Sequence, residues 1–483
     1  MDSKFTDEYA QQIEDKREDE MDATIDYVPG SDEEKKLVRK IDTFLLPTIF
    51  LMYLFSYMDR TNIGNARIAG MAKDLDLDSQ QYSFILVVFF IGYVLCEVPS
   101  NMILSRAKPS IFLPAIMFLW GCVTIGMAWA DSYEHLIAFR VVIGCLEAGF
   151  GPGILLMLSS QSLTLVAYKK DEQSKRFSVY ISAAILAGAF GGLLAGAIAS
   201  GMDGALGIRG WRWLFIIEGA LTAGWSVCAY FLLLDFPANS KRLSPREREL
   251  AIQRIIADSN TVATEDSPPI SHLQALKLGV QNWRTWGFTV GYMVIIGAGT
   301  LSYFYPTLVQ GLGYTSTKAQ YMTIPIYMVA FVCNIVTGYF ADKAPGQRGL
   351  IIGGGLIIAT ICSVIFCVVY NFTARYVLLV FMVRDLSALY LSAGAIWTCN
   401  ALSLSYASST FGAMPNETRA ICLAIVNALG NLASIYGAYL YPSTDAPKYI
   451  MGFSVVSAMS AFGAVVYILL HVFVRRYPVS RKV

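Results

Sequence analysis

The sequence predicts an all-α membrane protein with twelve transmembrane helices in two pseudo-symmetric six-helix halves. Hydrophobic residues make up 55% of the 483-residue chain and charged residues only 15%, and the mean hydropathy is +0.50. An average soluble domain has roughly 25% charged residues, and a soluble core stops growing near ~250–300 residues. Apolar stretches long enough to cross a bilayer recur along the chain, six on each side of one polar segment. We therefore expect a lipid bilayer to surround most of the chain.

The apolar stretches have lengths that suit a hydrocarbon core ~30 Å thick. An N-terminal half over 41–236 holds the first six, a C-terminal half over 285–474 holds the last six, and a tail over 475–483 follows. In chain order the predicted spans are 42–62, 80–104, 111–130, 134–160, 178–200, 211–235, 285–310, 319–340, 349–370, 375–400, 420–441 and 450–473.

Acidic residues dominate the segment before the first span. Residues 1–34 carry thirteen Asp or Glu and three Lys or Arg, a composition typical of disordered chain. A secretory signal would instead be basic and then apolar. The sequence therefore predicts a disordered acidic tail over 1–40.

The polar segment between the halves, residues 237–284, contains the start signals of a helix. Ser244 can cap the helix, Pro245 suits its first position, and Glu247 completes a capping box. We expect a cytoplasmic linker with a short amphipathic helix that lies along the membrane face or against the bundle; a linker without structure is the alternative. The apolar edge of the helix is formed by Leu250, Ile252, Ile255 and Ile256.

The distribution of Lys and Arg predicts the orientation. With the N-terminus in the cytosol, the inner segments carry 27 Lys and Arg and the outer loops carry 8. Cytoplasmic loops of membrane proteins hold the excess of positive charge. We therefore expect both termini in the cytoplasm, with the plasma membrane as the location and the monomer as the functional unit.

The composition argues against several classes of protein. The nine Cys lie in apolar runs without a close pair, and the three His sit at or beyond the ends of apolar segments. Neither arrangement is typical of a disulfide framework or a metal site. The chain lacks the phosphate-binding loop of an ATP-driven pump, and its net charge of +1 gives no basic face for nucleic acid. We expect neither an enzyme nor a bound cofactor.

Two ionisable residues lie within the fourth predicted span. Arg140 and Glu147 are seven residues apart, so they face the same side of a helix about 10.5 Å apart. This distance is too long for a direct ion pair, and charges at bilayer depth are costly unless they are paired or line a wet cavity. The pattern favours an Arg that holds an anion and a Glu that takes up a proton; a structural ion-pair network between helices is the alternative.

Further polar residues fall in or near predicted spans. Arg60 follows Asp59 at the end of span 1, at cavity depth if the helix continues and in a loop if it stops. Glu97 in span 2 is a second candidate for a proton site. We interpret Glu218 in span 6 as an interfacial carboxylate near Arg212.

Span 11 carries Asn427 and Asn431 on one helix face, where they either line a path or join helices. Aromatic side chains on the neighbouring spans are candidates for the rest of a cavity lining, which would favour a small flat or amide-bearing acid. These candidates are Tyr53, Tyr57, Tyr303, Tyr305 and Trp397.

Two motifs resemble the major facilitator superfamily. Residues 338–348 read Gly338-Tyr-Phe-Ala-Asp342-Lys343-Ala-Pro-Gly-Gln-Arg348, similar to the G-x-x-x-D-R/K…R loop motif of that family, and Arg140-Val-Val-Ile-Gly144 matches its R-x-x-x-G pattern in span 4. The loop motif places a carboxylate at a helix end near basic residues, a latch that could hold one access state closed. The resemblance implies the major facilitator fold.

Three longer stretches resemble the fungal allantoate-permease branch of the anion:cation symporters. They begin at Tyr57 (Tyr-Met-Asp-Arg-Thr-Asn-Ile-Gly), Leu146 (Leu-Glu-Ala-Gly-Phe-Gly-Pro-Gly) and Asn427 (Asn-Ala-Leu-Gly-Asn-Leu-Ala-Ser-Ile-Tyr-Gly). The resemblance implies proton-coupled uptake of a small carboxylate such as allantoate, nicotinate, pantothenate or biotin. It also implies anion binding by Arg60 and Arg140 and proton coupling by Glu147.

The chain departs from that pattern at two places. Residues 161–167 form an insertion after span 4, and Arg384 and Asp385 stand side by side in span 10. Both are genuine features or products of a mispredicted splice junction. The expected function is proton-coupled symport of a small organic anion by alternating access; the alternatives are a nutrient sensor with a transporter fold and an organic-anion antiporter or uniporter.

Overall fold

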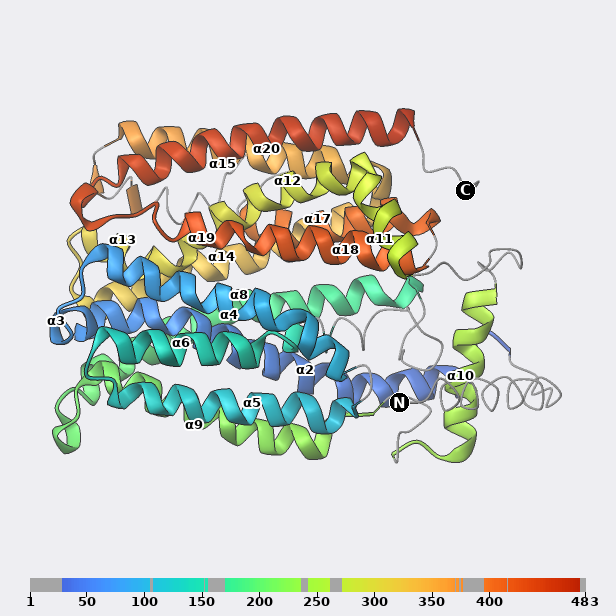
Figure 1. Ribbon diagram of the computed structural model, residues 1–483, viewed down its shortest axis with the longest axis horizontal. Helices are drawn as coiled ribbons and strands as arrows, with labels where there is room; N and C mark the ends of the chain where they lie inside the picture. Colours follow the sequence, from blue (N-terminus) through green and yellow to red (C-terminus); the bar gives the residue numbers. More distant parts are fainter. Residues whose placement is uncertain are drawn as a thin grey trace.

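The protein is a bundle of long helices in its computed structural model (Figure 1). The structure describes residues 28–104, 107–151, 153–154, 170–235, 242–260, 272–369, 371–372, 375–376, 395–414 and 416–477. Both ends of the described chain lie at one end of the bundle. We call the opposite end, where α2 leads into α3 and where α9 begins, the far end.

Six long helices form the N-terminal half. They are α2 (Asp32–Ala66), α4 (Ser79–Leu104), α5 (Pro109–Gly126), α6 (Tyr133–Glu147), α8 (Lys170–Gly201) and α9 (Gly210–Leu232). Short helical turns extend them at η1 (Arg67–Met71), α3 (Ala72–Asp74), η2 (Met127–Trp129) and η3 (Ala205–Gly207).

The C-terminal half repeats this arrangement with more interruptions. Its helices are α12 (Trp283–Gly299), η5 (Thr300–Phe304), α13 (Tyr305–Gly311), α14 (Ser316–Lys343), η6 (Pro345–Gln347), α15 (Arg348–Val368), α17 (Ala395–Thr410), η7 (Phe411–Ala413), α18 (Asn416–Asn431), α19 (Ala433–Gly437), η8 (Ser443–Asp445) and α20 (Ile450–Arg476). Between the halves lie α10 (Pro245–Asn260) and α11 (His272–Gln281).

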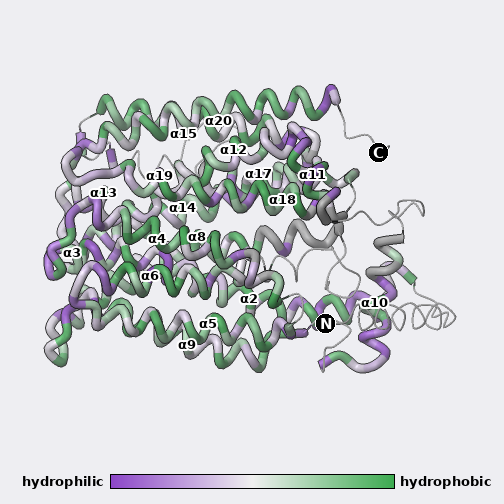
Figure 2. Tube along the Cα trace, viewed as in Figure 1, coloured by the Kyte–Doolittle hydropathy of each residue, from purple (hydrophilic) through white to green (hydrophobic). Residues whose placement is uncertain are grey.

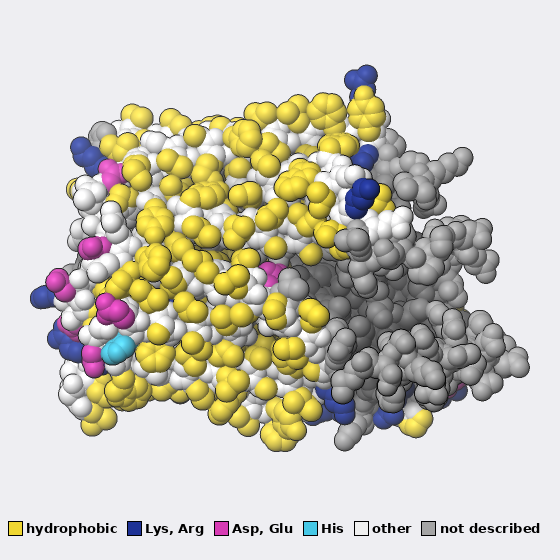
Figure 3. All heavy atoms as spheres, viewed as in Figure 1, with side chains coloured by type: hydrophobic (Ala, Val, Ile, Leu, Met, Phe, Trp, Pro, Cys, Tyr) yellow, Lys and Arg dark blue, Asp and Glu magenta, His cyan; other side chains and the backbone are white. Residues whose placement is uncertain are grey.

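The surface of the bundle is that of a membrane protein. Nine helices in the described part of the chain are long and apolar enough to cross a bilayer. Hydrophobic residues follow the long helices from end to end in Figure 2, and hydrophobic side chains cover the side of the bundle in Figure 3, where charged side chains collect mainly at its two ends. The predicted all-α membrane fold is confirmed.

The predicted boundary of the N-terminal tail is wrong. Helix α2 begins at Asp32, so residues 32–40 form its first turns instead of belonging to a disordered tail. Ser31 Oγ accepts a hydrogen bond from Glu34 N (3.3 Å), and Glu34 Oε2 accepts one from Gly30 N (2.7 Å). Ser31 therefore caps the helix with support from Glu34, and the three acidic residues of its first turn suit the positive end of the helix dipole.

The predicted end of span 10, placed over 375–400, is also wrong. Helix α17 continues to Thr410, ten residues past the predicted end. Residues 377–394, with Arg384 and Asp385, lie outside the described residues, as do the insertion 161–167 and the tail residues 1–27.

Helix α10 crosses the end of the bundle where the termini lie (Figure 1). The predicted capping box forms: Glu247 N donates to Ser244 Oγ (3.2 Å) and Ser244 N donates to Glu247 Oε2 (2.7 Å). Glu247 also binds Lys40 Nζ (2.8 Å), and Arg254 Nε donates to Glu34 Oε1 (3.2 Å) in a buried pair. The amphipathic helix therefore rests against the first turns of α2.

Glycines bring the long helices into backbone contact where the site lies. A Cβ on Gly144 of α6 would lie 2.2 Å from the backbone oxygen of Phe89 on α4. Such close approach is open only to a residue without a side chain. Helix α6 therefore packs directly on α4, and this contact fixes the position of Arg140 one turn earlier.

Candidate functional site

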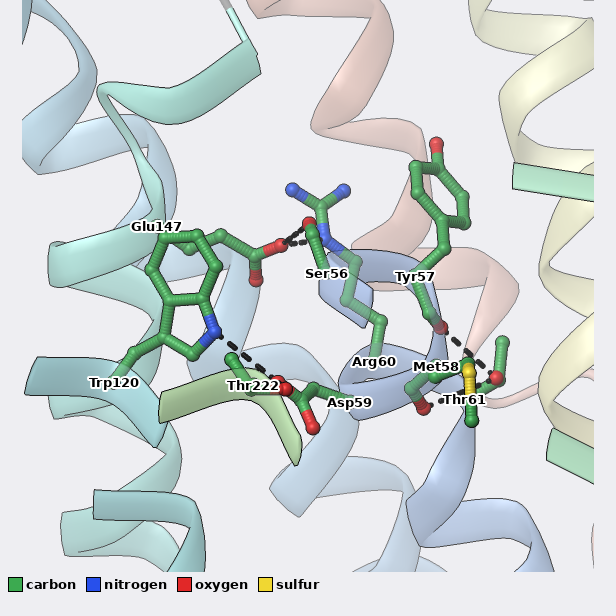
Figure 4. Close-up of polar contacts among 9 residues, drawn as sticks. All are labelled: Ser56, Tyr57, Met58, Asp59, Arg60, Thr61, Trp120, Glu147 and Thr222. Atoms are coloured by element: carbon green, nitrogen blue, oxygen red, sulfur yellow. Dashed lines mark hydrogen bonds and ion pairs between the residues drawn. The ribbon is translucent and has the colours of Figure 1, made fainter. Parts of the chain in front are cut away.

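A buried ion pair joins α2 to α6 in the N-terminal half (Figure 4). Arg60 Nε donates to Glu147 Oε1 at 2.8 Å, and Ser56 Oγ donates to the same oxygen. The Glu147 side chain is 1% exposed and that of Arg60 12%. Helix α2 continues to Ala66, so Ser56 and Arg60 lie one turn apart on one face and both reach Glu147.

Arg140 is a buried cation for which the described residues supply no ion-pair partner. It is 2% exposed, and its guanidinium carbon lies 4.7 Å from the ring centroid of Phe89. Its Nε has no hydrogen-bond partner, and no Asp or Glu of the described residues forms an ion pair with it. As predicted, Arg140 and Glu147 do not pair directly. The cation therefore lies against an aromatic ring, and its binding of an anion stays a prediction.

Aromatic side chains surround Arg60. Its guanidinium carbon lies 5.1 Å from the ring centroids of both Tyr57 and Tyr93. Tyr57 also contacts Trp397 of α17, with 6.1 Å between the ring centroids, and so joins the two halves. Three of the predicted lining residues therefore lie together, because Tyr53 packs edge-on against Tyr57 at 4.8 Å.

The two predicted tyrosines of the C-terminal half lie differently from each other. Tyr303 packs edge-on against Phe90 of α4, with 6.3 Å between ring centroids, and its backbone oxygen accepts a hydrogen bond from the Tyr82 hydroxyl (3.4 Å). Tyr305 packs edge-on against Tyr327 within its own half, at 5.4 Å between centroids. Tyr303 therefore reaches the site from the other half, while Tyr305 contributes to packing.

A polar chain connects α4 to α18 across the two halves. Asn427 Nδ2 donates to Glu97 Oε1 (3.3 Å), and Asn431 Nδ2 donates to Asn427 Oδ1 (3.4 Å). Glu97 Oε2 is buried and has no hydrogen-bond partner in the described part of the chain. Arg60 acts electrostatically on Glu97. Asn427 thus joins α18 to α4, and Asn431 supports it from one turn further along α18.

The interpretation of Glu218 as an interfacial carboxylate is wrong. Glu218 is 1% exposed, and its two oxygens lack hydrogen-bond partners among the residues described. Arg212, its expected neighbour, donates instead to Ala128 O (2.8 Å) and to Asp131 Oδ1 (2.7 Å). The position of Glu218 inside an apolar run was the signal that it is buried.

The predicted latch is described only in part. Gly338 and Lys343 lie in the last turns of α14, with Lys343 Nζ 4.4 Å from the ring centroid of Tyr339. Arg348 begins α15 and donates to Ser405 O at 3.5 Å. The side chain of Asp342 lies outside the described part, so the latch stays a prediction. The residues described contain no cluster of three His, Cys, Asp or Glu that could hold a metal ion.

Comparison with known proteins gives consistent results. Residues 49–438 match the model of the Major Facilitator Superfamily. The MFS-type transporter cnsO of Penicillium expansum is 31% identical over 460 residues, which cover 93% of this chain and 85% of that protein. The high-affinity nicotinic acid transporter of Saccharomyces cerevisiae is 28% identical over 436 residues, or 90% of this chain and 77% of that protein.

Solved structures show the same fold. A bacterial homologue of the human lysosomal transporter Spinster, crystallised in an inward-facing and unoccupied conformation, superposes with a TM-score of 0.67. The match covers 91% of this chain and 98% of that one at 16% sequence identity.

Proposed function

Because the chain belongs to the Major Facilitator Superfamily and is a multi-pass membrane transporter rather than an enzyme, we propose that it carries a small organic anion together with protons. The direction of net transport is into the cell, by alternating access of one site to the two sides of the membrane. The termini face the cytoplasm, the plasma membrane is the location, and the monomer is the working unit. The resemblance to the allantoate-permease branch of the anion:cation symporters supports this proposal.

The buried, unpaired guanidinium of Arg140 is the observation on which the proposal depends. A cation inside a membrane span is costly unless a counter-charge compensates it. Glu147 acts on Arg140 electrostatically, but no Asp or Glu of the described residues forms an ion pair with it. Arg binds carboxylates through a planar fork of two parallel hydrogen bonds, which Lys cannot form. The substrate anion supplies the missing counter-charge.

The Arg60–Glu147 pair provides the coupling. While Glu147 is ionised, it occupies Arg60 through the 2.8 Å hydrogen bond. A proton on Glu147 removes the negative charge and leaves Arg60 available to the substrate. Proton and anion therefore bind together, and the proton offsets the ~2.3 kcal/mol per 100 mV that an inside-negative potential costs an entering anion.

The rings around Arg60 favour a flat acid. The ring faces of Tyr57 and Tyr93 lie beside the guanidinium, and Trp397 packs edge-on against Tyr57. Aromatic surfaces stack on planar ligands. The yeast relative named as a nicotinic acid transporter agrees with an aromatic carboxylate. A free amino acid fits less well, because its ammonium group would meet Arg60 and Arg140.

The test is uptake of a panel of labelled solutes by the purified chain in liposomes. The panel contains nicotinate, pantothenate, biotin, allantoate and a neutral control, nicotinamide, each with and without an acid-outside pH gradient. We expect one carboxylate to enter several-fold faster with the gradient and nicotinamide to stay at the level of empty liposomes. Uptake of the neutral amide, or carboxylate uptake that ignores the gradient, would contradict the proposal.

A further inference from the structure

Three helices of the N-terminal half meet around Asp59, on the side of α2 that faces away from the aromatic site. Asp59 Oδ2 accepts hydrogen bonds from Trp120 Nε1 of α5 (3.1 Å) and Thr222 Oγ1 of α9 (2.9 Å), as Figure 4 shows. Asp59 is 7% exposed. No Lys or Arg of the described chain forms an ion pair with it.

A second polar layer lies one helical turn closer to the far end. The first layer consists of Asp59, Trp120 and Thr222. Helices α2 and α5 run toward the far end and α9 runs back from it. Asn62, Thr124 and Glu218 therefore each lie one turn closer to the far end than the first-layer residue of the same helix, a rise of about 4.5 to 6 Å. All three are nearly inaccessible, at 1%, 2% and 1% exposure.

The side-chain polar atoms of this second layer have no hydrogen-bond partners among the described residues. They are both polar atoms of Asn62, Oγ1 of Thr124 and both carboxyl oxygens of Glu218; Oδ1 of Asp59 has none either. Buried polar atoms are nearly always satisfied, so a group without partners needs an explanation. The backbone holds the layer together, because a Cβ on Gly219 would lie 2.7 Å from Gly121 O.

The charges near Glu218 leave it with one titratable neighbour. Asp59 acts on Glu218 electrostatically, and Arg140 and Glu147 act on Asp59. Four arginines on the surrounding helices are held in ion pairs with other carboxylates: Arg60 with Glu147, Arg176 with Asp42, Arg209 with Asp74 and Arg212 with Asp131. Arg67 lies over the ring of Tyr82, and Tyr180 stacks on Tyr53. Cys122, Cys228 and Tyr230 are exposed.

Asp59 and Glu218 form no ion pair with a cation of the described residues, and Arg140 acts on Asp59 but not on Glu218. Ionising both carboxyl groups would place two buried like charges side by side, which is unfavourable. Hydrogen bonds from donors favour the ionised form of a carboxyl group. Asp59 receives two such bonds and Glu218 receives none. The proton of the pair therefore belongs on Glu218, whose hydroxyl can donate to an oxygen of Asp59, Asn62 or Thr124.

We propose that Glu218 is a second proton-binding carboxyl of the transport cycle, distinct from Glu147 and coupled to it through Asp59. The step is a proton transfer: Glu218 gives its proton to Asp59 and becomes a carboxylate, Asp59 becomes the acid, and no other bond changes. This inference rests on the proposed proton-coupled transport. Two protons and one monovalent anion carry a net charge of +1, so an inside-negative potential drives their entry.

The first test measures whether Glu218 is protonated and does not depend on transport. The full chain is reconstituted in liposomes at pH 7, and the infrared band of protonated carboxyl groups is compared between wild type, Glu218→Gln and Glu134→Gln. Glu134 is exposed on α6 and serves as the matched control. We expect the band to weaken in Glu218→Gln alone. A band that is unchanged in Glu218→Gln, or absent from the wild type, would overturn the proposal.

The second test measures whether transport moves net charge across the membrane. Uptake of labelled nicotinate is measured at equal pH inside and outside, with and without an inside-negative potassium diffusion potential, in choline buffer. We expect the potential to accelerate wild-type and Glu134→Gln uptake several-fold and to leave Glu218→Gln unaffected, while a pH gradient still drives that variant. Potential-driven uptake by Glu218→Gln, or a requirement for sodium, would overturn the second proton site.

The two tests separate the inference from its premise. If the wild type takes up no acid in response to a pH gradient, the proposed function fails, yet the infrared comparison still decides whether Glu218 holds a proton. Glu218→Asp guards against a folding defect: it keeps the carboxyl group, so both the band and the response to the potential should return.

Discussion

Gly188 of α8 and the ring of Tyr327 on α14 lie in direct contact across the two halves of the molecule. A Cβ on Gly188 would lie 2.2 Å from two carbons of that ring. Gly192 and Gly196 repeat the contact closer to the far end, against Thr323 and Tyr321. The two halves are therefore packed tightly from the middle of these helices toward the far end.

This packing predicts that the added methyl group of Gly188→Ala reduces uptake. Gly188→Ala forces Tyr327 or one of the helices to move, because real Cβ atoms do not approach within 3 Å. We expect uptake to fall several-fold, since the state closed at the far end loses its fit. Gly224→Ala on α9 is the control, because nothing lies within 4 Å of its Cβ. Equal uptake by the two variants would show that the contact does not limit transport.

Glu147→Gln separates proton coupling from movement of the substrate. The amide keeps the size of the side chain and mimics the protonated acid, so Arg60 becomes free to bind substrate. We expect accumulation of nicotinate against its gradient to be lost, while exchange of labelled for unlabelled nicotinate continues. Liposomes preloaded with nicotinate measure exchange, and Glu134→Gln is the matched control. Persistent accumulation would assign the coupling proton to Glu97 instead.

The sequence predicted the charged residues of the site but not all of the contacts between them. Arg140 and Glu147 stand out because charges interrupt an apolar run, and their failure to pair follows from helix geometry alone. The Arg60–Glu147 pair joins residues 87 positions apart, and its formation depends on the rotation of α2 against α6. Sequence periodicity does not determine that rotation.

Glu218 and the start of α2 show the same limit. Arg212 is close to Glu218 in the sequence and was the expected partner. In the structure, Arg212 instead donates a hydrogen bond to Asp131 at the far end. The acidic composition of residues 32–34 suggested disorder, whereas their position at a helix N-terminus makes the same charges stabilising.

Helix α10 predicts a dependence of stability on pH. The hydrogen bond from Lys40, together with the backbone N–H of Ser244, holds the pKa of Glu247 below its ordinary value. A depressed pKa contributes stability that is complete above the unfolded value of roughly 4.3 and is lost as the pH falls through the folded value. We expect Glu247→Gln to lower the apparent melting temperature at pH 7 and to make less difference near pH 3. Thermal melting of the purified chain in detergent measures both, with Glu134→Gln for comparison.

The orientation predicts which segments a protease can reach. A cleavage site inserted between α10 and α11, at 261–271, should be cut only from the cytosol. A second site inserted in the loop of η8, at 443–448, lies at the opposite end of the bundle and should be cut only from outside intact cells. The reverse pattern would invert the topology and with it the direction of transport.

Arg140→Lys tests the anion site most directly. The substitution keeps the positive charge and most of the length of the side chain but removes the planar fork, so a site that needs only a positive charge would keep its function. The bidentate contact to a carboxylate is lost, and the ammonium is more strongly hydrated and less suited to the face of Phe89. Loss of about 1.5–3 kcal/mol, typical of hydrogen bonds to charged groups, corresponds to a fall of roughly 10- to 160-fold in the ratio of maximal uptake rate to half-saturating concentration. Arg212→Lys is the matched control, since Arg212 binds Asp131 at the far end, and its uptake should stay near that of the wild type. Normal uptake by Arg140→Lys would mean that the anion binds elsewhere, and Arg60→Lys would then be the variant expected to lose it.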